Sequence, residues 1–167
     1  MQVLFHTFGC KANQYDTERM RQEAQARGVL ITSDLGSADV CVVNTCTVTN
    51  AADAEAKRFV RRITRENPQT RIVVAGCSAV LRKREYVELD GVACVVPGHD
   101  PLQVAAAVVD VGEARGVPRG GLVQLGMNPG LDESHLEPIG AGILDRREGA
   151  TRGWLKIQDG CDRKCSF

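Results

Sequence analysis

The sequence predicts an α/β protein with an open, doubly wound, mostly parallel sheet and helices on both faces. Three observations lead to this prediction. Short apolar segments alternate with helical segments from residue 3 to about residue 111, as in a sheet built from strand–helix units. Residues 40–43 are apolar at every position, which is typical of a strand buried on both faces. Residues 51–66 show the clearest helical periodicity in the chain.

The first elements each have a local signal. Residues 3–8 form an apolar run that we expect to be the first strand. A helix should follow from about Asn13, whose side chain can cap it, and Gly28 is expected to stop it. A short strand is expected over residues 29–32, and a buried strand over residues 39–45.

The helix expected over residues 51–66 is amphipathic. Its apolar residues share one face, and the other face carries basic side chains: Lys57, Arg58, Arg61, Arg62 and Arg65. The pair Asn67-Pro68 should end it, because the residue before a proline is disfavoured in helical conformation. The basic face could contact RNA phosphate, although such a stripe is also what a solvated helix face looks like.

The remaining elements complete the alternation. A strand is expected over residues 71–76, followed by a helix over 80–89 that Gly91 closes, and then a strand over 92–96. Asp100 should cap the next helix, with Pro101 in its first position, and that helix should reach about residue 111. We therefore expect residues 1–111 to form a flavodoxin- or Rossmann-like domain.

Beyond residue 111 the pattern changes. Residues 112–150 are rich in glycine and proline, and we interpret them as a linker. Residues 151–167 contain one alternating strand pattern and a cysteine loop, which cannot fold alone. We expect this last segment to be the truncated start of a second domain.

Composition excludes some classes of protein. Because 21 basic residues balance 21 acidic ones, the overall charge gives no case for nucleic-acid binding, so such a surface would have to be local. No apolar run is long enough to span a membrane, and the N-terminus lacks the features of a signal peptide. We expect a cytoplasmic protein, in which the seven cysteines are ligands, redox groups or core residues rather than disulfides.

Three of the cysteines follow expected strands directly. Cys10, Cys46 and Cys77 occupy such positions, so a parallel sheet would bring all three to one edge, where ligands bind in doubly wound folds. Cys41 and Cys94 lie inside apolar strand runs, and we expect them to be small core residues. Three thiolates favour an iron–sulfur cluster, zinc or copper, and their spacing alone does not decide between these metals.

The motifs around these cysteines resemble a known family. Residues 8–18 (FGCKANQYDTE), 38–46 (ADVCVVNTC) and 74–77 (VAGC) are similar to the amino-terminal domain of the radical-SAM methylthiotransferases. Residues 155–167 (LKIQDGCDRKCSF) resemble the start of the radical-SAM domain of that family. The form of the first motif is most similar to the branch that acts on threonylcarbamoyladenosine in tRNA. On this resemblance, the chain is expected to be an amino-terminal fragment of a larger transferase.

The resemblance implies a role for five cysteines. Cys10, Cys46 and Cys77 match the ligands of an auxiliary [4Fe–4S] cluster, and Cys161 and Cys165 match the first two ligands of the radical-SAM [4Fe–4S] cluster. The third cysteine of that second motif would follow Phe167, so we expect one cluster in this chain and no activity from it alone. The family implies S-adenosyl-L-methionine (SAM) as a cofactor, a tRNA substrate and a protein reductant for the clusters.

The family's reaction inserts a methylthio group at carbon 2 of the modified adenosine next to the anticodon. Other branches act on isopentenyladenosine in tRNA or on an aspartate of a ribosomal protein. Two readings outside this family also stay open. One is a flavodoxin-like nucleotide-binding module without a cluster, although no G-x-G-x-x-G sequence follows any expected strand. The other is an interaction fragment with inert thiols.

Overall fold

The computed structural model describes residues 1–114 and Leu144. The chain divides into two compact units, Met1–Gly126 and Met127–Phe167, and the elements below belong to the first. The strands are β1 (Gln2–Thr7), β2 (Leu30–Thr32), β3 (Val40–Thr45), β4 (Arg71–Gly76) and β5 (Val92–Val95). The helices are α1 (Lys11–Ala26), α2 (Asn50–Glu66), α3 (Cys77–Leu81), α4 (Lys83–Val87) and α5 (Pro101–Glu113), with a 3-10 turn at Leu35–Ser37.

The five strands form one sheet in the order β2-β1-β3-β4-β5, and every pairing between them is parallel. The chain runs from β1 outward to β2, then returns across β1 to β3 and continues outward to β5. The strand order therefore reverses between β1 and β3. This is the flavodoxin-like arrangement, in which ligands bind at the carboxyl ends of the strands beside the reversal. The predicted fold class is confirmed.

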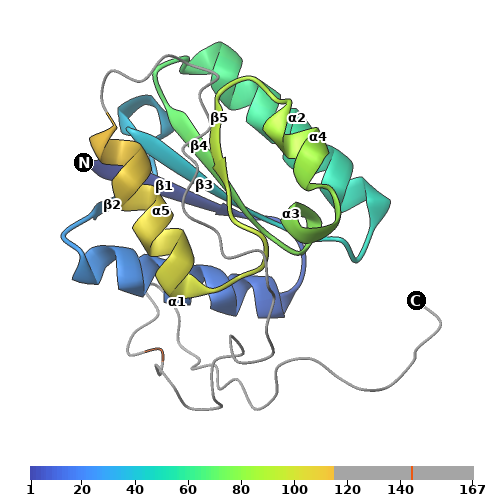
Figure 1. Ribbon diagram of the computed structural model, residues 1–167, viewed down its shortest axis with the longest axis horizontal. Coiled ribbons are helices and arrows are strands. Elements are labelled where there is room, and N and C mark those ends of the chain that lie inside the picture. The colour runs from blue at the N-terminus through green and yellow to red at the C-terminus, as the bar shows by residue number, and fades with distance from the viewer. Residues whose placement is uncertain (115–143, 145–167) are drawn as a thin grey trace. The chain divides into compact units, whose positions relative to one another are not determined.

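Helices cover both faces of the sheet (Figure 1). One core lies between the sheet and α1 with α5, where Met20, Ala24 and Val108 pack on strand residues such as Val42. The other lies between the sheet and α2 with α3 and α4, where Val60, Ile63 and Tyr86 pack on the opposite face. Alternate residues of β3 enter opposite cores, so this central strand is buried at all its positions, as its apolar sequence predicts.

The start of α1 differs from the prediction. We expected Asn13 to cap the helix, but α1 begins at Lys11 and its N-cap residue is Cys10, which makes no side-chain cap hydrogen bond. The side chain of Asn13 is buried and bonded to neighbouring loops instead. Tertiary hydrogen bonds thus outweigh its local preference for a cap. The cap predicted for α5 is present, since Asp100 accepts from the backbone N–H groups of Leu102 and Gln103.

The helix expected over residues 80–89 is two short helices. α3 begins at Cys77 itself, and α4 follows after Arg82, whose backbone (φ −125°, ψ 30°) leaves the helical region. The expected strand positions need only small changes: β1 begins and ends one residue earlier than predicted, and β2 and β3 each begin one residue later. α5 continues to Glu113, two residues beyond the predicted limit.

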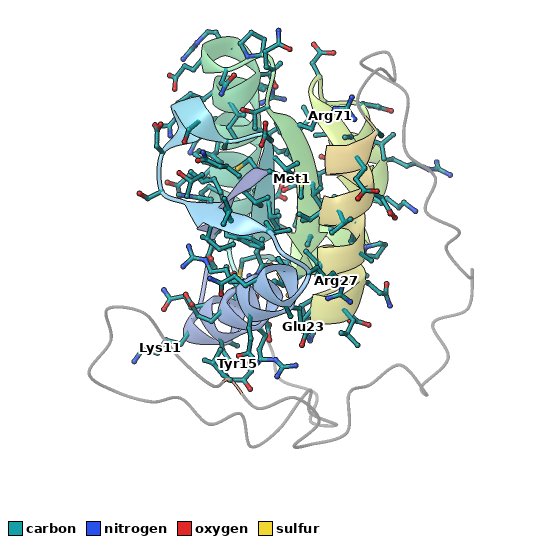
Figure 2. The ribbon with its side chains drawn as sticks, turned by 90° about the vertical axis from the view of Figure 1, so that its left-hand side faces the viewer. Met1, Lys11, Tyr15, Glu23, Arg27 and Arg71 are labelled. Atoms are coloured by element: carbon teal, nitrogen blue, oxygen red, sulfur yellow. The ribbon has the colours of Figure 1, made fainter. Side chains whose placement is uncertain are left out.

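Polar contacts tie the outer helices to the sheet. Arg71 at the start of β4 donates from Nη1 to the carbonyl of Val111 in α5, at 2.9 Å. Arg27, the C-cap residue of α1, pairs with Glu23 of that helix at 3.4 Å, and Lys11 at the other end of the helix is exposed (Figure 2). Among the helices described, none combines the length and the apolar character needed to cross a membrane.

Candidate functional site

The carboxyl ends of three neighbouring strands each lead into a cysteine. Cys10 follows β1 and precedes α1, Cys46 follows β3, and Cys77 follows β4 as the first residue of α3. Because β1, β3 and β4 are adjacent and parallel, all three cysteines lie at the same edge of the sheet. Cys10 and Cys46 flank the reversal in strand order, which is the position where this fold class binds ligands.

Two glycines allow these loops to approach one another. Gly9 and Gly76, each directly before a cysteine, have φ values of +104° and +94°, a region that favours glycine. A Cβ built on Gly9 would lie 2.3 Å from Cys46 Cβ, and one on Gly76 would lie 2.3 Å from Asn44 Oδ1 and from the Thr45 carbonyl oxygen. The first loop therefore packs its backbone on Cys46, and the third packs its backbone on the strand end before Cys46.

Buried polar side chains join the three cysteine loops through hydrogen bonds. The Asn13 side-chain Nδ2 donates to the carbonyls of Phe8 (2.9 Å) and Thr45 (2.7 Å). Asn44 Nδ2 donates to the Asn13 carbonyl at 3.0 Å and to Thr17 Oγ1 at 2.9 Å. Thr45 Oγ1 donates to the Ala75 carbonyl at 2.6 Å, which links the ends of β3 and β4. These bonds satisfy buried donors and hold the three strand ends in register.

The three thiols differ in exposure. Cys10 is exposed, Cys46 is buried and its Sγ accepts from the Val48 backbone N–H at 3.4 Å, and Cys77 is half-buried. Burial raises the pKa of Cys77, and the neighbouring negative groups of Cys46, Cys10 and Asp16 raise that pKa further. Negative charge on these side chains is therefore unfavourable at Cys77, and a bound cation would relieve that repulsion.

The described residues do not contain a closed metal site. Within residues 1–114 and Leu144, no group of three or more His, Cys, Asp or Glu side chains stands in an arrangement that could hold a metal ion. The three cysteines share an edge and flanking loops, but their sulfurs would have to move toward one another to bind one metal group. Cys161 and Cys165 lie outside the described residues.

Cys41 and Cys94 lie in the cores, as expected. Cys41 belongs to the core under α2 and Cys94 to the core under α5. Burial raises the pKa of Cys41 to about 12 and that of Cys94 to about 11. Both thiols are therefore protonated at neutral pH, and their positions separate them from the three edge cysteines.

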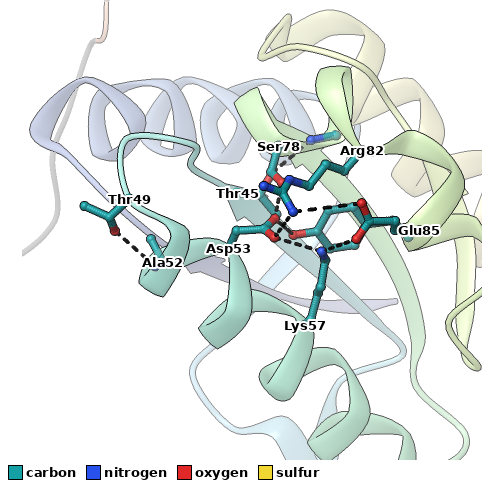
Figure 3. A network of polar contacts seen from close by, with 10 residues as sticks. Thr45, Thr49, Ala52, Asp53, Lys57, Ser78, Arg82 and Glu85 are labelled. Atoms are coloured by element: carbon teal, nitrogen blue, oxygen red, sulfur yellow. Dashed lines mark hydrogen bonds and ion pairs between the residues drawn. The ribbon is translucent and has the colours of Figure 1, made fainter. Parts of the chain in front are cut away.

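A second polar cluster, which the sequence did not reveal, supports the residue after Cys77. Asp53 of α2 is buried and accepts a hydrogen bond from Ser78 Oγ (Figure 3). It also accepts one from the Tyr86 hydroxyl, at 2.9 Å. Lys57 Nζ lies 2.8 Å from Asp53 Oδ2, and Arg82 Nη1 lies 3.4 Å from the same oxygen. The Asp53 carboxylate thus holds α2, α3 and α4 together beside the third cysteine.

The charges in this cluster stabilise one another. Burial by itself would raise the pKa of Asp53, but hydrogen bonds from Lys57, Ser78 and Tyr86 outweigh that effect and hold the pKa below its usual value. Burial likewise acts to lower the pKa of Lys57, and its bonds to Asp53 and Glu85 raise it above the usual value instead. Asp53 is therefore ionised and Lys57 protonated in the folded protein at neutral pH.

These contacts change the predicted basic surface. Lys57, expected on the solvated face of α2, turns toward Asp53 and Glu85 and is largely buried. Arg82 also pairs with Asp53. Four arginines of α2 remain exposed: Arg58, Arg61, Arg62 and Arg65. Contact between this face and RNA stays a prediction.

Comparison with known proteins finds one matching family model and several relatives that match nearly the whole chain. The family model described as "Uncharacterized protein family UPF0004" matches residues 2–98. The threonylcarbamoyladenosine tRNA methylthiotransferase MtaB of Bacillus subtilis is 36% identical over 165 residues, covering 99% of this chain and 35% of that protein. MtaB of Aquifex aeolicus is 29% identical over 167 residues, covering 100% of this chain and 38% of that protein.

A relative whose name gives a different modified nucleoside has a lower sequence identity to this chain. The tRNA-2-methylthio-N(6)-dimethylallyladenosine synthase of Thermodesulfovibrio yellowstonii is 25% identical over 170 residues, covering 99% of this chain and 36% of that protein. The chain thus spans little more than a third of the length of these curated relatives. The family match includes β1 to β5 and all three edge cysteines. The chain belongs to the family described as uncharacterized protein family UPF0004 and is homologous to tRNA methylthiotransferases of the MtaB type.

Proposed function

We propose that this chain is the part of a tRNA methylthiotransferase that holds an auxiliary [4Fe–4S] cluster through Cys10, Cys46 and Cys77. One observation carries the proposal: three cysteines end three adjacent parallel strands at the reversal in strand order. The names of the MtaB relatives support threonylcarbamoyladenosine in tRNA as the substrate of the whole enzyme. The dimethylallyladenosine enzyme is a more distant relative, which makes that branch the alternative.

The donor set fits such a cluster in kind and in number. Thiolates are the usual ligands of iron–sulfur clusters, and three of them leave one iron of a cubane open. When bound, the cluster would supply the site at which the sulfur to be transferred is held. The chain's own residues would hold and orient it, since Gly9 and Gly76 bring the loops close and Asp53 fixes the segment after Cys77. Cys10 is exposed at the start of α1, whereas Cys46 is buried and Cys77 is half-buried.

The second half of the proposal concerns the segments beyond the sheet. Residues 112–150 would be a linker, and residues 151–167 the start of a radical-SAM domain in which Cys161 and Cys165 are cluster ligands. SAM, the second cluster, the tRNA and a protein reductant would then act in the longer enzyme, in the cytoplasm. Two thiolates in this chain are too few for a radical-SAM cluster, so we expect no SAM cleavage by it alone.

Anaerobic reconstitution with iron and sulfide tests whether Cys10, Cys46 and Cys77 hold the cluster of this chain. The 167-residue chain should take up about four irons, as one cluster, with the visible absorption of an iron–sulfur protein. The variant with alanine at Cys10, Cys46 and Cys77 should take up almost none. Its matched control, with alanine at Cys161 and Cys165, should bind as much iron as the parent. Loss of the cluster from the control, or SAM cleavage by the parent, would contradict the proposal.

A nucleotide-binding module is the second candidate, because the strand order is that of flavodoxin-like proteins, which bind ligands at the same reversal. Titration of the metal-free chain with flavin mononucleotide and with adenosine nucleotides distinguishes the two. Binding that survives in the triple-alanine variant would favour the module. Absence of binding together with iron uptake favours the cluster domain.

A further inference from the structure

The side chain of Asn13 contacts all three cysteine loops. Its Nδ2 donates to the carbonyl of Phe8, two residues before Cys10, and to the carbonyl of Thr45, directly before Cys46. Its Oδ1 lies 4.0 Å from Cys77 Sγ, which is in position to donate a weak hydrogen bond. Asn13 is 3% exposed, so these protein groups, rather than water, satisfy it.

These contacts use the whole carboxamide. The group has two N–H donors and one carbonyl acceptor in a single plane, and the two carbonyl partners fix which side carries the nitrogen. Aspartate has the same shape but lacks both donors. Alanine would leave the Phe8 and Thr45 carbonyls without this partner in a buried position. The three contacts therefore depend on asparagine at this position.

The backbone of Asn13 is held as firmly as its side chain. Its carbonyl accepts from Asn44 Nδ2 at 3.0 Å and from Thr17 Oγ1 at 2.9 Å. Thr17 in turn accepts from Thr7 Oγ1 at 2.7 Å, which connects α1 to the end of β1. Asn13 is thus fixed from β1 and β3 while its amide reaches the three loops, so the spacing of the loops is tied to the sheet.

We propose that Asn13 is a positioning residue that sets the mutual spacing of the Cys10, Cys46 and Cys77 loops before any metal binds. This inference rests on the proposed function for one point, namely that the three thiols serve to bind a cluster. The spacing itself is a property of the metal-free protein. It can therefore be measured with a reagent that joins thiols without a cluster.

Arsenite is such a reagent. Up to three thiols each replace one hydroxyl group of As(OH)3. For each one, an As–S bond forms, an As–O and an S–H bond break, one water is released, and the oxidation state of arsenic does not change. The full 167-residue chain carrying serine at Cys161 and Cys165 keeps the three edge thiols and the two core thiols. Arsenite affinity follows from the thiolate–arsenic ultraviolet absorption, and mass spectrometry identifies the cysteines that are joined.

Asn13→Ala should weaken arsenite binding by about tenfold to a hundredfold, in line with the loss of buried hydrogen bonds that hold the loops. The matched control is Thr70→Val. Thr70 is 3% exposed and its hydroxyl donates to the Ala38 carbonyl at 2.8 Å, at the amino end of the sheet. Thr70→Val should lose a similar amount of stability and keep the parent's arsenite affinity. Equal affinities of parent and Asn13→Ala, or equal losses in the two variants, would overturn the proposal.

A measurement on the parent avoids the risk that Asn13→Ala does not fold. The side-chain amide protons of Asn13, followed by NMR, should exchange with water much more slowly than those of its exposed neighbour Gln14. Similar exchange rates at the two amides would overturn the proposal. If the parent takes up no iron but the arsenite and exchange results hold, the cluster proposal fails and the positioning role of Asn13 stands. If the parent does not join edge thiols through arsenic, the positioning role fails.

Discussion

The backbone of Gly9 lies against the side chain of Cys46, so closely that a Cβ at Gly9 would come within 2.4 Å of Cys46 Sγ. Cys46 follows the central strand β3, and Gly9 precedes Cys10 at the end of the neighbouring strand β1. The absence of a side chain at Gly9 is therefore what lets the first and second cysteine loops pack together.

Gly9→Ala should destabilise the protein by roughly 2–4 kcal/mol, from backbone strain and from the collision with Cys46. Gly28→Ala is the matched control: Gly28 has φ +79°, but apart from its own neighbours in the chain no heavy atom lies within 4 Å of its Cβ position. It should cost only the backbone strain, about 1 kcal/mol. Urea unfolding measures both. Equal losses in the two variants would mean that the contact between Gly9 and Cys46 is not tight in solution.

Asp53→Ala should cost about 2–4 kcal/mol, because it leaves Ser78 and Tyr86 without their buried acceptor and Lys57 without one of its two carboxylates. The control is Glu66→Ala, which removes the exposed pairs with Arg62 and Arg65 and should change stability by less than about 0.5 kcal/mol. Thermal or urea unfolding compares them. A change of similar size in both variants would show that the Asp53 cluster contributes no more than a surface pair.

Cys41→Ala and Cys94→Ala should each lower stability by about 1 kcal/mol, as for other small buried side chains. Neither should change the iron content after reconstitution, because both thiols lie in the cores. With pKa values near 12 and 11 they should also resist alkylation in the folded chain, whereas the exposed Cys10 should react first. Loss of iron from the Cys41 variant would show that the ligands were assigned wrongly.

The sheet could be predicted from the sequence because its signals are local. The apolar runs of β1, β3 and β4 and the periodicity of α2 identify the elements, and parallel topology then places Cys10, Cys46 and Cys77 at one edge. The Gly-Cys pairs at residues 9–10 and 76–77 also indicate that the cysteine loops pack closely, since a glycine at a strand end allows close approach of the backbone.

The contacts that organise the site could not be predicted, because they join residues far apart in the sequence. Asn13 has the local signal of a helix cap, but its partner Thr45 is 32 residues away. Asp53 meets Tyr86 across 33 residues. Helical spacing places Asp53 on the buried face of α2 with Ala56 and Val60, but it does not identify the partners that bind its carboxylate. The break at Arg82 belongs to the same group, since this residue leaves the helix where it pairs with Asp53.

The Asp53 cluster should also make the fold sensitive to acid. The pKa of Asp53 is held below its usual value in the folded state, so the unfolded chain binds its proton first as the pH falls. The stability that Asp53 contributes is complete above the ordinary aspartate pKa, near pH 4, and is lost as the pH falls through the folded-state value.

Asp53→Asn, which cannot titrate, should be less stable than the parent at neutral pH but should lose less stability on acidification. Tyr86→Phe removes one hydrogen bond that lowers the folded-state pKa, so its loss of stability on acidification should be smaller than the parent's and should end at a higher pH. Urea unfolding between neutral pH and about pH 3 follows all three proteins. Parallel losses in the parent and Asp53→Asn would assign the acid sensitivity to other carboxylates.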